Sequence, residues 1–260
     1  MVKKLQNLYI YLVLVFLYAP ILVLAVYSFN ASKSNRVWGG FSLKWYVALF
    51  SDREIMSALY YTLMCAIAAT VVSTIIGTIS AIGMHALNDF PRIKAFALNI
   101  NYLPVINPDI VTGISLMLVF SFASARMGFV TMLISHITFC VPYVVLSVLP
   151  KLNQMDKHLI EAAMDLGASP MFALRKIVLP EIYSGIVTGA LLAFTLSIDD
   201  FVISFFNTGS GVSNLSIFIY SAARRGISPE VNALSTLMVL CVSILLVVAN
   251  LRSGKEIASK

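Results

Sequence analysis

Long apolar runs alternate with short polar connections along the whole chain. A helix needs about 20 mostly apolar residues to cross a lipid bilayer. The runs that reach this length are 7–29, 59–84, 96–122, 129–149, 182–205 and 231–251. The pattern therefore predicts an all-α polytopic membrane protein with six transmembrane helices, organised as a single transmembrane domain over residues 1–260.

The first of these runs follows Lys3 and Lys4, so a cleaved signal peptide is the alternative to a membrane span. The apolar stretch is longer than a signal peptide requires, and no cleavage site of the Ala-x-Ala kind follows it. We therefore expect residues 7–29 to be a retained first span.

Composition supports the membrane assignment. Hydrophobic residues make up 59% of the chain and charged residues 12%, whereas soluble domains are about half apolar and about a quarter charged. The net charge of +6 could suggest a nucleic-acid partner, but the basic residues lie scattered between apolar runs. They are predicted to set the membrane topology, and no nucleic-acid partner is expected. Lys and Arg are more numerous in the connections on the side that holds both termini, which places both termini in the cytoplasm.

With this orientation, residues 30–57 form a loop on the outer face. Four aromatic residues of the loop are predicted to anchor it at the membrane surface, where amphipathic rings sit among lipid headgroups: Trp38, Phe41, Trp45 and Tyr46. Docking of an external protein is the alternative role for this loop.

The chain carries no signature of an enzyme. Cys65, Cys140 and Cys241 all fall inside apolar runs and are expected to be small buried residues rather than disulfides or metal ligands. No phosphate-binding loop of the form G-x-x-x-x-G-K-[ST] is present. The isolated histidines favour structural or interfacial roles over catalysis: His85, His136 and His158. We expect no catalytic residues, metal or cofactor in this chain, so any energy from ATP has to enter through a partner.

The connection over residues 150–180 is too elaborate for a simple turn. Asp156 is placed to cap a first short helix, and Gly167 suits the left-handed position that ends it. Ser169 and Pro170 then supply an N-cap and a first helical residue for a second helix. Pro180 marks the bend into the fifth span.

The first short helix is amphipathic. Lys157, Glu161 and Asp165 share a polar face at i, i+4 spacing. An opposite apolar face contains Leu159, Ala163 and Leu166. A solvated surface turn has no use for such a stripe, so the pattern favours a protein partner.

Residues 161–180, EAAMDLGASPMFALRKIVLP, closely resemble the EAA loop of binding-protein-dependent ABC-transporter permeases. The matching positions are Glu161, Ala162, Ala163, Gly167, Ile177, Leu179 and Pro180. The resemblance implies a cytoplasmic coupling helix, residues 161–168, seated in a groove of a separate ATPase subunit. The coupling residues implied in this way are Glu161, Ala162, Ala163, Asp165, Leu166 and Gly167.

Three carboxylates interrupt the predicted spans: Asp109, Asp199 and Asp200. Each ionised Asp near a bilayer centre costs roughly 2.5–3.5 kcal/mol on insertion scales. Asp199 lies 18 residues after Glu181 and Asp109 lies 15 residues after Lys94, which at a rise of about 1.5 Å per residue puts both in the outer half of the membrane. No Lys or Arg lies inside a span, so we expect the substrate to supply the positive charge.

Each carboxylate also has a plainer interpretation. Asn107, Pro108 and Asp109 could form the cap and first turn of a helix that restarts after a break, and Pro104 supports such a break. Asp199 and Asp200 could simply lie near the headgroups, where charge is cheap. Adjacent helical residues point about 100° apart, so the pattern leaves open which of the pair faces a pathway.

Further stretches, including NPDIVTGISL and FTLSIDDFVISFF, resemble the spermidine/putrescine permease subunits of bacterial ABC importers. This resemblance covers nearly the whole chain. It implies an inner-membrane permease for polyamines with a second, non-identical permease subunit, two ATPase subunits that bind ATP and Mg, and an external polyamine-binding protein. It also implies that Asp109, Asp199 and Asp200 line the substrate pathway.

Three alternatives remain at this stage. The same architecture could carry another cation or small solute. The aspartates could relay protons or sodium in a transporter driven by an ion gradient. A membrane scaffold without transport would make the aspartates dispensable.

Overall fold

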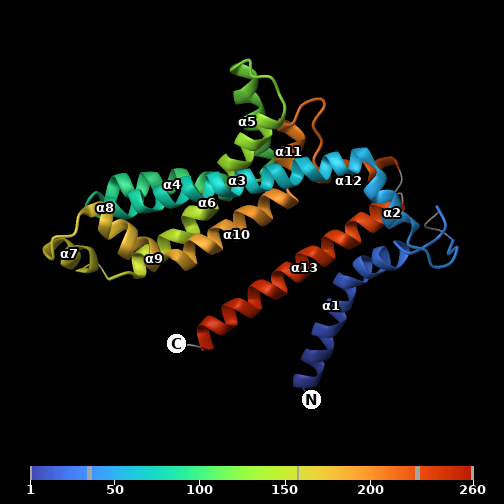
Figure 1. Ribbon diagram of the computed structural model, residues 1–260, viewed down its shortest axis with the longest axis horizontal. Coiled ribbons are helices and arrows are strands. Elements are labelled where there is room, and N and C mark those ends of the chain that lie inside the picture. Colours follow the sequence, from blue (N-terminus) through green and yellow to red (C-terminus); the bar gives the residue numbers. More distant parts are fainter. Residues whose placement is uncertain (1, 34–36, 157, 226–228, 259–260) are drawn as a thin grey trace. The chain divides into compact units, whose positions relative to one another are not determined.

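The computed structural model describes residues 2–33, 37–156, 158–225 and 229–258 (Figure 1). Apart from one isolated bridge between Asn30 and Phe41, regular structure in these ranges is helical. The elements are α1 Val2–Tyr27, α2 Lys44–Ser51, α3 Arg53–Ala86, η1 Leu87–Asp89, α4 Pro91–Ile106, α5 Asp109–Phe122, α6 Phe129–Gln154, α7 His158–Asp165, α8 Pro170–Ala173, η2 Leu174–Val178, α9 Leu179–Glu181, α10 Tyr183–Asp199, α11 Val202–Asn207, α12 Leu215–Arg225 and α13 Pro229–Ala258.

The chain divides into two compact units. One comprises Met1–Met56 with Phe218–Lys260, and the other is Ser57–Ile217. In the first unit α13 contacts both α1 and α2. In the second, α6 contacts α4, α5, α10 and α11. The single transmembrane domain over residues 1–260 stays a prediction.

Several of the predicted spans have a matching helix in the described residues. Three helical stretches are long and apolar enough to cross a membrane alone: Gln6–Tyr27, Arg53–Asp89 and Phe129–Gln154. Two bent pairs, α4 with α5 and α8–α9 with α10, raise that number to as many as five. A shorter apolar stretch of α13, Pro229–Cys241, lies where the sixth span was expected. The all-α class is confirmed, and the count of six stays a prediction.

The third apolar run is broken, as its prolines predicted. α4 and α5 meet at an angle of 107°. The break lies at Asn107 and Pro108, both extended with ψ near 140°, because a residue before proline avoids the helical region. Pro104 stays inside α4. The plainer interpretation is correct in that a helix restarts here with Asp109 in its first turn. It is wrong for the cap, since Asn107 ends α4 and Pro108 occupies the N-cap position of α5 without a side-chain bond.

Two helices of the second unit, α3 and α10, approach α6 closely through glycine. A Cβ placed on Gly77 of α3 would lie 2.6 Å from the Val144 side chain. On α10, a Cβ at Gly185 would lie 2.9 Å from the carbonyl oxygen of Ser147, and one at Gly189 would lie 3.1 Å from the Val144 Cα. These contacts fix the register of α10 along α6, and therefore which part of α6 lies beside the C-terminal end of α10.

The segment between α1 and α2 is folded around Asn30. The Asn30 side chain donates to the carbonyl of Val37 at 2.8 Å and accepts from the Gly39 amide at 2.7 Å. The Trp45 indole donates to the Asn30 carbonyl at 2.6 Å and is only 5% exposed. The prediction of surface anchoring is therefore wrong for Trp45, whose buried indole holds the loop together. Trp38 and Phe41, in contrast, are exposed.

The cysteine prediction is correct at two positions of three. Cys65 and Cys140 are buried, whereas Cys241 of α13 is exposed, and all three are free thiols. Residues Val239, Leu240 and Ile244 around Cys241 are exposed as well. An apolar run in the sequence therefore does not distinguish a face covered by protein from an uncovered one.

Candidate functional site

The fifth apolar run breaks at the paired aspartates. α10 ends at Asp199, Asp200 is extended with ψ 126°, and α11 begins at Val202. The Asp200 carboxylate turns back onto α11, where it accepts the amides of Ile203 at 3.0 Å and Ser204 at 2.7 Å, and the Ser204 hydroxyl at 2.8 Å. Three of the chain's own donors thus stabilise this carboxylate at the start of a short helix.

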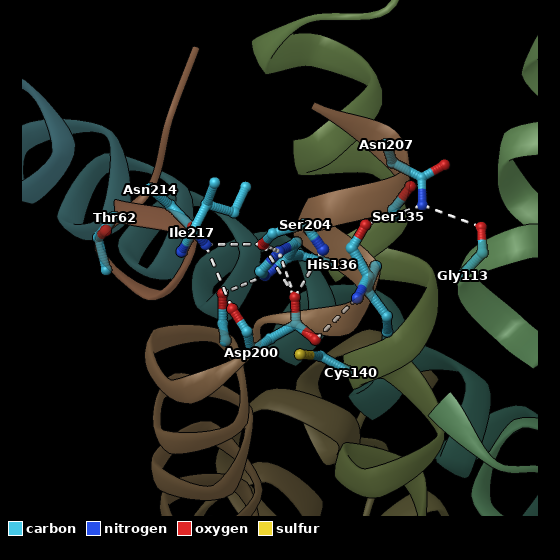
Figure 2. Close-up of polar contacts among 12 residues, drawn as sticks. Thr62, Gly113, Ser135, His136, Cys140, Asp200, Ser204, Asn207, Asn214 and Ile217 are labelled. Carbon is cyan, nitrogen blue, oxygen red and sulfur yellow. Dashed lines mark hydrogen bonds and ion pairs between the residues drawn. The ribbon is translucent and has the colours of Figure 1, made fainter. Parts of the chain in front are cut away.

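A buried histidine joins this break to α6 (Figure 2). Nδ1 of His136 lies 2.7 Å from the Ser197 hydroxyl of α10, and its Nε2 lies 2.8 Å from the Ser204 hydroxyl of α11. Nε2 is also 3.4 Å from the Asp200 carboxylate, whose side chain is 6% exposed. One imidazole ring therefore contacts both helices on either side of the break.

The chain that follows α11 closes the same network. The Asn214 amide donates to the Ser204 hydroxyl at 2.8 Å and to the Asp200 carbonyl at 3.2 Å. Leu215 then donates its amide to the Thr62 hydroxyl of α3 at 2.8 Å. We call His136, Ser197, Asp200, Ser204 and Asn214 the break network.

The far end of α11 is held separately. The Asn207 side chain donates to the Gly113 carbonyl of α5 at 3.1 Å (Figure 2). Thr131 of α6 donates to the Asn207 carbonyl at 2.7 Å. A Cβ on Gly113 would lie 3.3 Å from the Phe206 ring. Both ends of α11 are thus bound to neighbouring helices, so it is a fixed half-helix and not a loose loop.

The other two candidate aspartates lie in the open. Asp109 is in the first turn of α5 and is exposed. Asp199 is the last residue of α10 and is exposed. Neither carboxylate has a hydrogen-bond or ion-pair partner in the part of the chain that the structure describes. The three predicted carboxylates therefore fall into two kinds, Asp200 satisfied internally and Asp109 and Asp199 not.

The connection over residues 150–180, called the coupling loop below after its predicted role, has the turn chemistry that its sequence predicted. The Asp156 carboxylate accepts the His158 amide at 3.0 Å, and the Ser169 hydroxyl caps α8 through Phe172 at 3.3 Å. Gly167 is left-handed, with φ 86°. The Ala168 amide donates to the Ala163 carbonyl at 3.0 Å and the Gly167 amide to Met164 at 2.9 Å; this pair of bonds defines a Schellman ending.

The coupling loop also carries uncovered apolar side chains. Leu166 is 90% exposed, and Met164 and Phe172 are about half exposed. A hollow of about 570 Å³ beside them is lined by Ala163, Leu166, Gly167, Ala168, Ser169 and Phe172. Glu161, Ala162 and Asp165 are exposed too, whereas Lys157, predicted on the polar face, lies outside the described residues.

Sequence reasoning missed the break network because its members are far apart in the chain. His136 precedes Ser197 by 61 residues and Ser204 by 68. The sequence singled out Asp200 and a histidine inside an apolar run, but it gave no partner for either. His85 and His158, by contrast, contact Asn153 and Glu161 at exposed positions.

Comparisons with known proteins identify the family. Residues 73–252 match the family described as binding-protein-dependent transport system inner membrane component. The putrescine transport system permease protein PotI of Escherichia coli K12 is 42% identical over 235 residues, covering 88% of this chain and 83% of that protein. The spermidine/putrescine transport system permease protein PotC of Haemophilus influenzae is 37% identical over 252 residues and 97% of both chains.

Solved structures support the same fold at low sequence identity. A chain of a bacterial ABC transporter involved in the import of the acidic polysaccharide alginate aligns with a TM-score of 0.76, at 15% identity over 98% of this chain and 95% of that one. A chain of the MetNI methionine ABC transporter aligns with a TM-score of 0.61, at 19% identity over 77% of this chain and 96% of that one. With its family match and its near full-length relatives, the chain belongs to the inner membrane components of binding-protein-dependent transport systems, which are transport subunits and not enzymes.

Proposed function

We propose that this chain is a permease subunit of an ATP-driven importer for polyamines of the spermidine and putrescine class. The observation that carries the substrate class is the pair of exposed carboxylates at two helix breaks, Asp109 and Asp199, neither of which has a partner among the described residues. Broken helices commonly line binding sites in membrane transporters. A flexible cation with several ammonium groups matches carboxylates that are spaced apart on different helices, and the similarity to PotI and PotC supports this choice.

Asp200 has a different role in this proposal. Its carboxylate already accepts three hydrogen bonds from α11 and is buried against His136. It stabilises the break that presents Asp199, and the transported polyamine contacts Asp199 and Asp109.

Energy enters through the coupling loop. Glu161 to Gly167 form the part of α7 and its ending that contacts a partner ATPase, with Leu166 as the apolar anchor because it is 90% exposed. The ATPase pair binds ATP and Mg. Its closure pushes the loop, and the bend of 66° between α8–α9 and α10 passes the movement to the broken span.

The proposed assembly contains this chain, a second permease subunit, two ATPase subunits and an external polyamine-binding protein. Both termini and residues 150–180 lie on the cytoplasmic side, and residues 30–57 lie on the outer side. The family assignment supports a partner ATPase and an external binding protein. The second permease is the subunit on which the uncovered apolar faces of the spans pack.

Uptake of radiolabelled spermidine into proteoliposomes containing the full assembly tests the substrate role. Asp199→Asn and Asp109→Asn should each lower the uptake rate at least about tenfold, since a charge pair at 4 Å is worth about 4 kcal/mol at an effective dielectric constant near 20. Asp89→Asn, at an exposed carboxylate in η1, is the matched control and should leave uptake unchanged. Full uptake in both test variants would contradict the proposal.

The same preparation separates the alternative mechanisms. Uptake that needs ATP inside and survives an uncoupler supports an ATP-driven importer. Uptake that collapses with the uncoupler while ATP is intact supports an ion-gradient transporter. Competition by unlabelled amines, other cations and neutral solutes then defines the substrate class.

A further inference from the structure

Two adjacent carboxylates have opposite surroundings at the end of α10. Asp199 is exposed, and Asp200 has a side chain that is 6% exposed and turned toward α11 and α6. The two residues lie next to each other at the break between α10 and α11. The contacts of Asp200 with α11 and α6 therefore distinguish the two carboxylates.

His136 binds both sides of the break between α10 and α11. A serine hydroxyl has one proton to donate and two lone pairs to accept. Ser204 donates that proton to the Asp200 carboxylate and accepts from the Asn214 amide. Its remaining contact, with Nε2 of His136 at 2.8 Å, therefore has the histidine as donor.

This assignment holds in either charge state of the ring, because neutral imidazole protonated at Nε2 and imidazolium both donate there. In the neutral form, Nδ1 accepts the Ser197 hydroxyl at 2.7 Å, and each described polar atom of the ring then has a partner. His136 is 1% exposed, Ser197 2% and Ser204 0%. Losing one such buried hydrogen bond is costly, since water does not replace it.

The ring has a geometry that no single neighbour reproduces. Ser197 lies two residues before Asp199, and Ser204 lies four residues after Asp200. Asn214 also contacts Ser204 and the Asp200 carbonyl, but it holds only the α11 side. Within the break network, His136 is the member whose side chain contacts α10 and α11 together.

We propose that His136 is a positioning residue that keeps Asp200 turned inward and thereby presents Asp199 to the transport pathway. The ring acts through the contacts of its Nε2 with Ser204 and Asp200 and of its Nδ1 with Ser197. It does not contact the transported polyamine. The transport consequence rests on the proposed function; the orientation of Asp199 does not.

Thiol labelling measures that orientation directly. The background is Cys241→Ser, because Cys241 is the exposed native thiol, while the buried Cys65 and Cys140 are kept. In the assembled transporter, Asp199→Cys is exposed to a small cationic methanethiosulfonate reagent and its rate of modification is followed. Asp109→Cys, on α5 and outside the break network, is the matched reporter of a general change in fold.

Two substitutions at His136 separate the contacts of the ring. Glutamine has an amide nitrogen at about the place of Nε2, so His136→Gln retains the donor to Ser204. Asparagine is shorter and reaches only to about the place of Nδ1, so His136→Asn loses the Ser204 side. We expect His136→Asn to slow labelling of Asp199→Cys about tenfold, the factor that corresponds to about 1.4 kcal/mol, and His136→Gln to restore most of the rate.

The outcomes are distinct. A slower Asp199→Cys reaction with an unchanged Asp109→Cys reaction, recovered by glutamine, supports the positioning role. An unchanged rate in His136→Asn, an equal fall at both reporters, or no difference between asparagine and glutamine overturns it. Because labelling needs no polyamine, a failure of the proposed substrate would appear only in the uptake assay and would leave this result intact.

Discussion

The coupling loop and the break between α10 and α11 are opposite exceptions to the rule that apolar side chains are buried and charged ones exposed. In the loop, a leucine is 90% exposed to solvent. At the break, a carboxylate and a histidine are buried beneath apolar helices. An uncovered leucine is stable because the loop's own turns hold the backbone, whereas a buried carboxylate is stable only if every acceptor is satisfied. The exposed leucine is consistent with the proposed ATPase partner of the loop, whereas the contacts at the break all come from this chain.

The largest expected effect concerns the buried side of this comparison. Asp200→Leu should lower the free energy of unfolding by about 3 kcal/mol or more. The substitution leaves the Ile203 and Ser204 amides and the Ser204 hydroxyl without their acceptor, and each such loss costs about 1–3 kcal/mol. Denaturant unfolding of the chain in detergent micelles measures the change.

The neighbouring aspartate provides the control for this variant. Asp199→Leu alters an exposed residue without a partner among the described residues, so its effect on the same unfolding free energy should stay within about 0.5 kcal/mol. An equal fall in the free energy of unfolding in the two variants would contradict the structure, in which Asp200 is turned inward and Asp199 is exposed.

The reciprocal substitution on the loop should have the reciprocal result. Leu166→Asp should leave the stability of the isolated chain unchanged, because Leu166 contributes little buried area within it. Binding of the partner ATPase should weaken about tenfold to a hundredfold, since burying a leucine is worth about 1.5–3 kcal/mol. Leu166→Met keeps an apolar side chain of similar volume and should bind almost normally.

Co-purification of the ATPase with the permease, followed by titration of the purified subunits, gives this affinity. Retention of full affinity in Leu166→Asp would remove Leu166 from the proposed contact. Loss of stability without loss of affinity would show that the exposed loop supports its own chain instead.

The two regions also differ in how far the sequence predicted them. Asp156, Gly167 and the Ser169–Pro170 pair act on backbone groups within a few residues, so local turn chemistry was enough to predict the caps and the left-handed ending. The break in the third span followed from Pro108 for the same reason. These features need no tertiary information.

The break network could not be predicted in this way. His136 reaches Ser197 and Ser204 only because Gly185 and Gly189 let α10 pack closely on α6 and set its register. Which of two adjacent aspartates turns inward depends on that register, and a single sequence without known contacts does not contain it. The carboxylates were identified from the sequence, but the difference in their surroundings is visible only in the packing of α10 on α6.

The smallest expected effect tests why the coupling loop has glycine at position 167. Its φ of 86° favours glycine, and an ordinary L-residue there costs about 1–2 kcal/mol, although asparagine tolerates the conformation. Within the chain a Cβ at this position would meet nothing within 4 Å, so space becomes limiting only when a partner docks. Under the proposed close approach of the ATPase, side-chain size should outweigh backbone preference: the ratio of uptake to ATP hydrolysis should fall a few-fold in Gly167→Ala, further in Gly167→Asn and most in Gly167→Leu. If asparagine instead performed better than alanine, the left-handed backbone alone would explain this glycine, and the ATPase would not approach it closely.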